Sequence, residues 1–194
     1  MSGGAEARPQ GAGKRRPVIA VIGSGEGVDE GTLALAGTVG RLLAQRGATL
    51  VTGGRGGIME AASHGASEAG GLVVGVLPGT DAGDANAYVD VAIPTGLGFA
   101  MRNVITIRMA DAVIMISGEV GTLAEAVLAY QHGKPLVAVA STGGWAERLR
   151  TAALEDGRYL DGRRLMEIGY ADTADEAVEA AFARIGTVPR PGKL

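Results

Sequence analysis

The segment SGEVGTLAE, from Ser117 to Glu125, carries the strongest chemical signal in the chain. It follows a run of apolar residues, and Gly121 and Thr122 stand where a helix is predicted to begin. The first N–H groups of a helix have no intrahelical partner, so together with the Thr122 hydroxyl they suit a phosphate group. Glu125 either caps its own helix end or faces a ligand, where it would accept hydrogen bonds from ribose hydroxyls or transfer a proton. The predicted ligand-binding residues of this segment are Gly118, Glu119, Val120, Gly121, Thr122 and Glu125.

Two further glycine-rich segments follow apolar runs. In Gly53-Gly-Arg-Gly-Gly57, four glycines surround one arginine, and a helix is predicted from Ile58. Backbone amides, the Arg55 guanidinium and the positive end of that helix could converge on an anion, although a flexible turn with a solvated arginine is the alternative. Gly23-Ser-Gly25 follows the first apolar run, and a tight turn between strand and helix is the alternative there. The predicted ligand contacts are Gly23, Ser24, Gly25, Gly53, Gly54, Arg55, Gly56 and Gly57.

The first glycine turn does not match a dinucleotide-binding fingerprint. Val28 stands where the third glycine is required, and Thr52 and Gly53 stand where an acidic residue would bind the ribose. The phosphate-binding loop Gly-x-x-x-x-Gly-Lys-Ser/Thr does not occur, so NAD binding and a P-loop NTPase are both disfavoured. The chain has no cysteine and two histidines, so no metal site is predicted.

A third polar cluster, Met101-Arg102-Asn103, lies near the start of a predicted helix and after a glycine-rich loop. A single arginine of this kind is usually solvated, so the pattern alone does not assign it a function. These three residues join the candidate ligand-binding set because of the family resemblance described below.

Composition and charge limit the class of partner. The net charge is −3, and residues 1–17 carry +3, so the rest of the chain carries −6. An acidic body disfavours nucleic acid as a partner, and aromatic residues make up only 4% of the chain, which disfavours base-stacking platforms for single strands. No apolar run approaches the roughly 18 residues of a membrane span. The expectation is a cytoplasmic protein that binds neither nucleic acid nor membrane.

Apolar runs that alternate with helical patterns must position these motifs. Strands are predicted over 18–22, 48–52, 72–77, 89–93, 112–116, 135–140 and 167–170, and helices over 29–46, 58–69, 98–109, 122–131, 144–155 and 174–184. The alternation predicts an α/β fold, a Rossmann-like three-layer sandwich with a predominantly parallel sheet, which binds ligands at the carboxyl ends of its strands. Residues 18–186 are predicted to form one ligand-binding domain, between a disordered basic leader (1–17) and a C-terminal tail (187–194).

The ordered motifs resemble a known superfamily over about residues 18–185. The motifs are the Gly-Ser-Gly turn, Thr-Gly-Gly-Arg-Gly-Gly-Ile-Met-Glu, Met-Arg-Asn and Gly-x-x-Gly-Thr-Leu-x-Glu. The set resembles the lysine-decarboxylase-like superfamily, which includes the cytokinin-activating nucleoside-monophosphate phosphoribohydrolases. Three features resemble most closely its branch of molybdenum cofactor carrier proteins: Thr95-Gly-Leu-Gly98, Arg102-Asn103 and Thr142-Gly-Gly-Trp145. The resemblance implies a homodimer or a dimer of dimers.

The resemblance also implies roles for two residues. The catalytic arginine and glutamate of the phosphoribohydrolases correspond to Arg102 and Glu125. The hydrolases carry lysine in place of Asn103, and Pro-Gly-Gly in place of Ser117-Gly-Glu119. Glu119 also departs from the glycine usual in the carrier proteins, and a carboxylate there would oppose a phosphate unless it points away or pairs with an arginine.

Three functions therefore remain open at the level of sequence. The preferred one is a binding protein for a phosphate-bearing heterocycle, with molybdenum cofactor or a purine nucleotide as the bound ligand. The alternative is a nucleoside 5′-monophosphate phosphoribohydrolase, which releases free base and ribose 5-phosphate and uses Arg102 and Glu125 as catalytic residues. A structural oligomer with a vestigial site is the third. Binding is preferred because the departures fall at the catalytic motif while the glycine-rich segments are retained.

Overall fold

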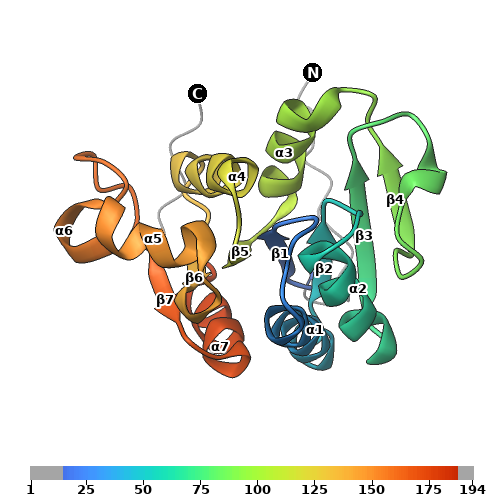
Figure 1. The fold of residues 1–194 in the computed structure, drawn as a ribbon, viewed down its shortest axis with the longest axis horizontal. Coiled ribbons are helices and arrows are strands. Elements are labelled where there is room, and N and C mark those ends of the chain that lie inside the picture. The colour runs from blue at the N-terminus through green and yellow to red at the C-terminus, as the bar shows by residue number, and fades with distance from the viewer. Residues whose placement is uncertain (1–14, 188–194) are drawn as a thin grey trace, which may run out of the picture.

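The apolar runs of the sequence form a single parallel sheet. The structure, a computed structural model, describes residues 15–187, so most of the predicted leader and tail lies outside the described residues. The strands are β1 (Val18–Gly23), β2 (Thr49–Thr52), β3 (Leu72–Leu77), β4 (Val91–Pro94), β5 (Ala112–Ile116), β6 (Leu136–Val139) and β7 (Gly169–Ala171). They lie in the order β4-β3-β2-β1-β5-β6-β7, and every neighbouring pair is parallel (Figure 1). The predicted Rossmann-like α/β fold is confirmed.

Helices cover both faces of the sheet (Figure 1). One layer contains α1 (Glu30–Gln45), α2 (Ile58–Glu68) and α7 (Ala174–Arg184), and the other contains α3 (Gly98–Met109), α4 (Val120–Gln131) and α5 (Gly144–Ala152). Side chains of β5 alternate between the two cores: Ile114 packs in the first and Met115 in the second. Burial on both faces explains why the strand sequences are continuous apolar runs rather than alternating ones.

The strand order reverses at the centre of the sheet. The first half of the chain adds strands outward from β1 to β4, and the second half starts again at β5, on the other side of β1. Ile19 of β1 is paired with Ala112 of β5, and Gly23 with Ile116. In open parallel sheets such a reversal leaves a crevice at the carboxyl ends of the two central strands, where ligands bind.

Helices α1 and α2 pack with their backbones in contact. A Cβ atom added to Gly40 of α1 would lie 1.9 Å from the carbonyl oxygen of Ala62, and one added to Gly65 of α2 would lie 1.9 Å from that of Gly37. No side chain larger than hydrogen fits at either position, so the glycines set the distance between the helices.

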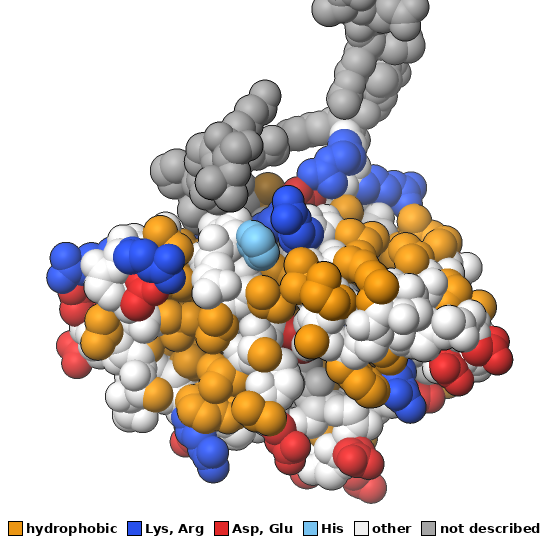
Figure 2. All heavy atoms as spheres, turned by 90° about the horizontal axis from the view of Figure 1, so that it is seen from above, with side chains coloured by type: hydrophobic (Ala, Val, Ile, Leu, Met, Phe, Trp, Pro, Cys, Tyr) orange, Lys and Arg blue, Asp and Glu red, His pale blue; other side chains and the backbone are white. Residues whose placement is uncertain are grey.

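Hydrophobic side chains gather on the outer side of the α3 and α4 layer, as Figure 2 shows from that direction. Leu97, Phe99 and Met101 near the start of α3, and Val120 at the start of α4, are 55%, 59%, 53% and 75% exposed. Within residues 15–187, no helix is long and apolar enough to cross a membrane.

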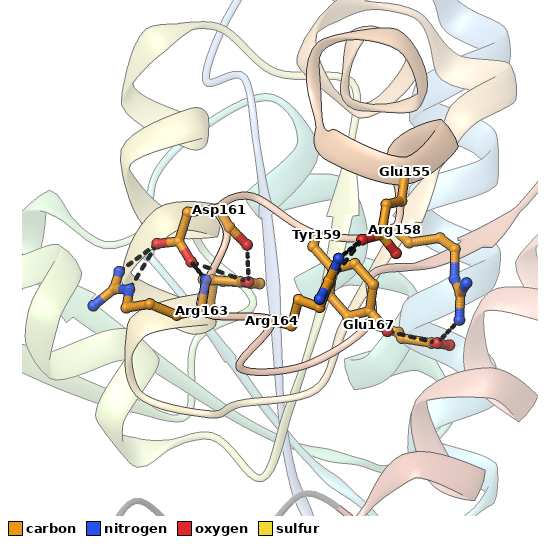
Figure 3. Close-up of polar contacts among 8 residues, drawn as sticks. Glu155, Arg158, Tyr159, Asp161, Arg163, Arg164 and Glu167 are labelled. Carbon is orange, nitrogen blue, oxygen red and sulfur yellow. Dashed lines mark hydrogen bonds and ion pairs between the residues drawn. The ribbon is translucent and has the colours of Figure 1, made fainter.

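The chain between α5 and β7 is irregular. The prediction of one helix over 144–155 is wrong at its end, because α5 stops at Ala152 and Glu155 and Asp156 adopt positive φ values of 52° and 56° within the short α6 (Leu154–Gly157). Ion pairs hold the segment: Arg158 with Glu167, Arg163 with Asp161, and Arg164 with Glu155 (Figure 3). None of these residues lines the cavity described next.

Candidate functional site

A cavity of about 520 Å³ lies at the carboxyl ends of β1, β2 and β5, where the strand order reverses. Its volume is in the range of small-molecule binding sites. The two halves of the chain both contribute to it: the loops after β1 and β2 form one side, and α3 and the start of α4 form the other. The lining residues are Gly23, Ser24, Gly25, Glu26, Arg55, Gly56, Met59, Phe99, Arg102, Asn103, Glu119, Gly121, Thr122 and Glu125.

The structure brings eleven of the predicted residues together on this lining. They come from all four motifs: Gly23, Ser24, Gly25, Arg55, Gly56, Arg102, Asn103, Glu119, Gly121, Thr122 and Glu125. Six others do not line the cavity: Gly53, Gly54, Gly57, Met101, Gly118 and Val120. Sequence reasoning missed Glu26, Met59 and Phe99. All three lie in or beside motifs of the sequence: Glu26 follows Gly25, Met59 is within Thr52–Glu60, and Phe99 follows Thr95-Gly-Leu-Gly98.

Several of the glycines that do not line the cavity shape it instead. Gly57 has a φ of 64°, and a Cβ atom there would lie 2.4 Å from the carbonyl oxygen of Ser24. The Ile58 N–H donates to the same oxygen at 3.0 Å, so the loops after β1 and β2 are joined directly. Gly118 has a φ of 107°, and a Cβ atom there would lie 2.6 Å from the Cβ of Thr122. These positions require glycine because neighbouring atoms pack closely against them, so the requirement does not depend on contact with a ligand.

The N-terminus of α4 opens onto the cavity. Its N-cap residue, Glu119, makes no side-chain hydrogen bond to the first turn. The N–H groups of Val120, Gly121 and Thr122 precede the first intrahelical bond, in which Leu123 donates to Glu119. A Cβ atom added to Gly121 meets nothing within 4 Å, so this part of the cavity is open. Such an arrangement of amides at the positive end of a helix suits an anion.

The segment Thr142-Gly-Gly-Trp145 positions the turn before α4. Ser117, which has a φ of 52°, donates its N–H to the Thr142 hydroxyl at 2.7 Å. In the other direction, the Trp145 N–H donates to the carbonyl of Gly118 at 2.9 Å. Gly144 makes the contact possible, because a Cβ atom there would lie 2.7 Å from that carbonyl oxygen. The start of α5 therefore holds the turn that carries the anion-binding amides.

Arg102 and Glu125 form a buried pair in the cavity. Arg102 Nη1 lies 3.9 Å from Glu125 Oε1, and the residues are 5% and 7% exposed. A Cβ atom on Gly53 would lie 1.9 Å from the same Nη1, so Gly53 provides the space that the guanidinium occupies. Arg102 Nε has no hydrogen-bond partner within residues 15–187. A buried donor without a partner is costly, and binding sites are among the places where structures retain one.

Burial shifts the pKa of both members of this pair. It raises the pKa of Glu125 to about 7, and the positive charge of Arg102 opposes the rise. Burial also lowers the pKa of Arg102, with the carboxylate of Glu125 opposing the change and the charge of Arg55 adding to it. A carboxyl group with a pKa near 7 can both hold and release a proton at neutral pH. The described part of the chain contains no cluster of three His, Cys, Asp or Glu side chains that could hold a metal ion.

A doubly wound parallel sheet with a charged cavity at its switch point defines the class of the protein, a Rossmann-like α/β domain. Residues 16–175 match the SLOG cluster4 family. The chain belongs to this family.

Three solved structures are similar to this chain. The X-ray structure of TM1055 is 42% identical, with a TM-score of 0.80 over 86% of this chain and 99% of that one. The molybdenum cofactor binding protein from the phototrophic bacterium Rippkaea orientalis is 33% identical, with a TM-score of 0.74 over 88% of this chain and 98% of that one. The molybdenum cofactor carrier protein of Chlamydomonas reinhardtii is 32% identical, with a TM-score of 0.72 over 88% and 98%. The resemblance to molybdenum cofactor carrier proteins is thus confirmed at the level of sequence and fold.

Proposed function

We propose that this protein binds a phosphate-bearing heterocycle, molybdenum cofactor or a purine nucleotide, in the cavity between the carboxyl ends of β1 and β5. One observation carries the proposal: the open N-terminus of α4 and the buried guanidinium of Arg102 line the same cavity. The similarity to molybdenum cofactor binding and carrier proteins supports it.

The charges of the lining favour a ligand with two chemically different parts. The α4 amides, Arg55 and Arg102 attract an anion, and a ligand oxygen near Arg102 would satisfy a donor whose isolation costs about 1–3 kcal/mol. Glu26, Glu119 and Glu125 line the same cavity and would repel a bare anion. Carboxylates accept hydrogen bonds from hydroxyl and amino groups, which a sugar and a heterocycle supply. A phosphate joined to such groups satisfies both parts of the lining.

Replacing Gly121 with valine tests the proposal. The added side chain has space, so the fold should be retained, but it would stand between the α4 amides and a phosphate. Losing one charge-assisted hydrogen bond weakens binding roughly 10- to 100-fold, which calorimetry with AMP and with molybdenum cofactor would measure. Gly162→Val is the matched control, because a Cβ atom there also meets nothing within 4 Å and the residue is not on the lining. Unchanged affinity in Gly121→Val would contradict the assignment and move the anion to the Gly53–Gly57 loop.

The buried Arg102–Glu125 pair favours phosphoribohydrolase activity as a second candidate function. Cleavage of an N-glycosidic bond passes through an oxocarbenium-like state, which an adjacent carboxylate stabilises. Glu125, with a pKa of about 7, could supply this charge, and Arg102 could orient the ligand. Incubation with AMP separates the two functions. Release of adenine and ribose 5-phosphate at enzyme-like rates, lost in Glu125→Ala, would establish the hydrolase, whereas binding without release supports the binding protein.

A further inference from the structure

Phe99 places an exposed aromatic ring on the cavity wall. It is the second residue of α3, is 59% exposed and lines the cavity. Phe99 and Met59 are the large apolar side chains of a lining that otherwise consists of glycine, polar and charged residues. The cavity therefore has an apolar wall on α3 and α2, in addition to the amides of α4.

Two arginines from different parts of the chain lie within cation–π distance of the Phe99 ring. The Cζ atoms of Arg55 and Arg102 lie 5.7 Å and 5.9 Å from the ring centroid, within the range of cation–π attraction. The Arg55 backbone is itself held, because Asn86 donates its side-chain N–H to the Arg55 carbonyl at 2.9 Å. The ring thus lies beside two positive charges, one of which belongs to the buried pair.

The Phe99 ring, which is 59% exposed and lies next to two cations, suits a flat, electron-rich ring system. Bases stack on aromatic side chains, and alanine substitution at such platforms weakens binding about 5- to 150-fold per base. A sugar phosphate without a base offers the ring no comparable surface. The apolar wall therefore distinguishes ligands by their heterocycle, a property that the anion-binding amides cannot provide.

We infer that Phe99 is the platform on which the heterocycle of the bound ligand stacks, so that the cavity selects phosphate esters bearing a planar heteroaromatic ring over ringless sugar phosphates. The inference rests on the proposed function, in which α4 binds the phosphate. It adds the residue that determines ring specificity.

Calorimetry on four proteins tests the inference: the unchanged chain, Phe99→Ala, Phe99→Trp and Leu97→Ala. AMP and molybdenum cofactor serve as ring-bearing ligands, and ribose 5-phosphate serves as the ringless one. We expect Phe99→Ala to weaken the ring-bearing ligand about 5- to 150-fold and ribose 5-phosphate by less than about 2-fold. Phe99→Trp should retain the affinity, because a larger ring preserves stacking. Leu97→Ala removes another exposed apolar side chain, 55% exposed and outside the lining, and should change neither affinity.

The outcomes separate this inference from the proposed function. If Phe99→Ala weakens both kinds of ligand equally, or neither, the stacking platform is refuted while phosphate binding stands. If it changes only the oligomeric mass in light scattering, the ring packs against a second copy of the chain and the platform is also refuted. If the unchanged chain binds none of the three ligands, the proposed function fails and the inference falls with it.

Discussion

Replacing Glu125 with glutamine should remove much of the pH dependence of folding stability between pH 5 and 8. Burial raises the pKa of Glu125 from its ordinary value of 4.5 to about 7. Below pH 4.5 the folded and unfolded chains both keep the proton. Between pH 4.5 and 7 the unfolded chain loses it first, so the free energy of unfolding falls as pH rises. Above pH 7 both states are ionised and the loss stays constant. A pKa difference of this size corresponds to about 3 kcal/mol.

Glutamine has no titratable proton, so the free energy of unfolding of Glu125→Gln lacks this pH-dependent contribution. The folded Glu125 is a negative partner of Arg102 only above about pH 7, and the attraction between them is already included in the Glu125 pKa of about 7. Urea denaturation at pH 5, 6, 7 and 8 would measure both proteins. We expect the stability of Glu125→Gln relative to the unchanged chain to rise by about 2–3 kcal/mol across this range. Glu119→Gln removes an exposed carboxylate from the same cavity and controls for the loss of one charge.

Parallel stability curves for Glu125→Gln and the unchanged chain would refute the reasoning. They would show that the Glu125 carboxyl is ionised equally easily in the folded and unfolded states. The proton-transfer role that favours the hydrolase would then lose its physical basis, whereas phosphate binding at α4 would not be affected.

Four further predictions follow from the packing. Gly53→Ala should displace Arg102, since the added Cβ atom would lie 1.9 Å from Arg102 Nη1. Calorimetry should then show AMP binding weakened at least about 10-fold. Unchanged affinity would show that Arg102 does not contact the ligand. Thr142→Val removes the acceptor of a hydrogen bond from the turn after β5 and should lower the free energy of unfolding by about 1–3 kcal/mol, measured by urea denaturation. An unchanged urea midpoint would contradict this prediction. Gly65→Ala should destabilise the fold by about 1–3 kcal/mol by separating α1 from α2. Gly37→Ala is the control, because a Cβ atom there would lie 3.5 Å from its nearest neighbour; it should stabilise the fold by up to about 1 kcal/mol. Equal effects of the two substitutions on the free energy of unfolding would contradict the close packing of Gly65. Leu97, Met101 and Val120, exposed apolar side chains outside the cavity lining, lead us to expect a homodimer or a dimer of dimers, so a monomer mass in light scattering would be evidence against this assembly.

The location of the glycine-rich turns at one edge of the sheet could be predicted, because it follows from a parallel sheet. Continuous apolar strands such as β5 must be buried on both faces, which requires a parallel sheet covered by helices. The carboxyl ends of parallel strands share one edge of the sheet, so the glycine-rich turns after β1, β2 and β5 could be placed on that edge. The strand order, which the sequence pattern does not specify, makes them neighbours. As ligand contacts, the residues of these turns remain predictions.

The separate roles of the glycines could not be predicted. In the sequence, Gly53 and Gly121 both belong to glycine-rich turns after strands, yet one seats the Arg102 guanidinium and the other borders open space. The difference depends on loop conformation, which no local pattern specifies. Phe99 was missed for a related reason: it lines the cavity only because the sheet order places α3 beside the loop that carries Arg55.

The end of α5 shows where a helical sequence pattern fails to predict the structure. The sequence after Ala152 includes residues with ordinary helix propensity, but Glu155 and Asp156 adopt left-handed conformations. A tertiary contact holds the chain that follows: the Leu165 N–H donates to the hydroxyl of Tyr130 in α4 at 3.1 Å.

The pairing of β1 with β5 also has a consequence for folding kinetics. Ile19 pairs with Ala112, more than ninety residues further along the chain, so this seam closes a long loop. Non-local pairings of this kind form slowly, because chain entropy is lost before the contact is gained. The cavity spans the seam, because its lining includes Arg55, which precedes β5 in the chain, and Thr122, which follows it. A bound ligand would therefore recognise only the assembled sheet and would slow its opening, adding about 2.7 kcal/mol to stability at a ligand concentration of a hundred times Kd.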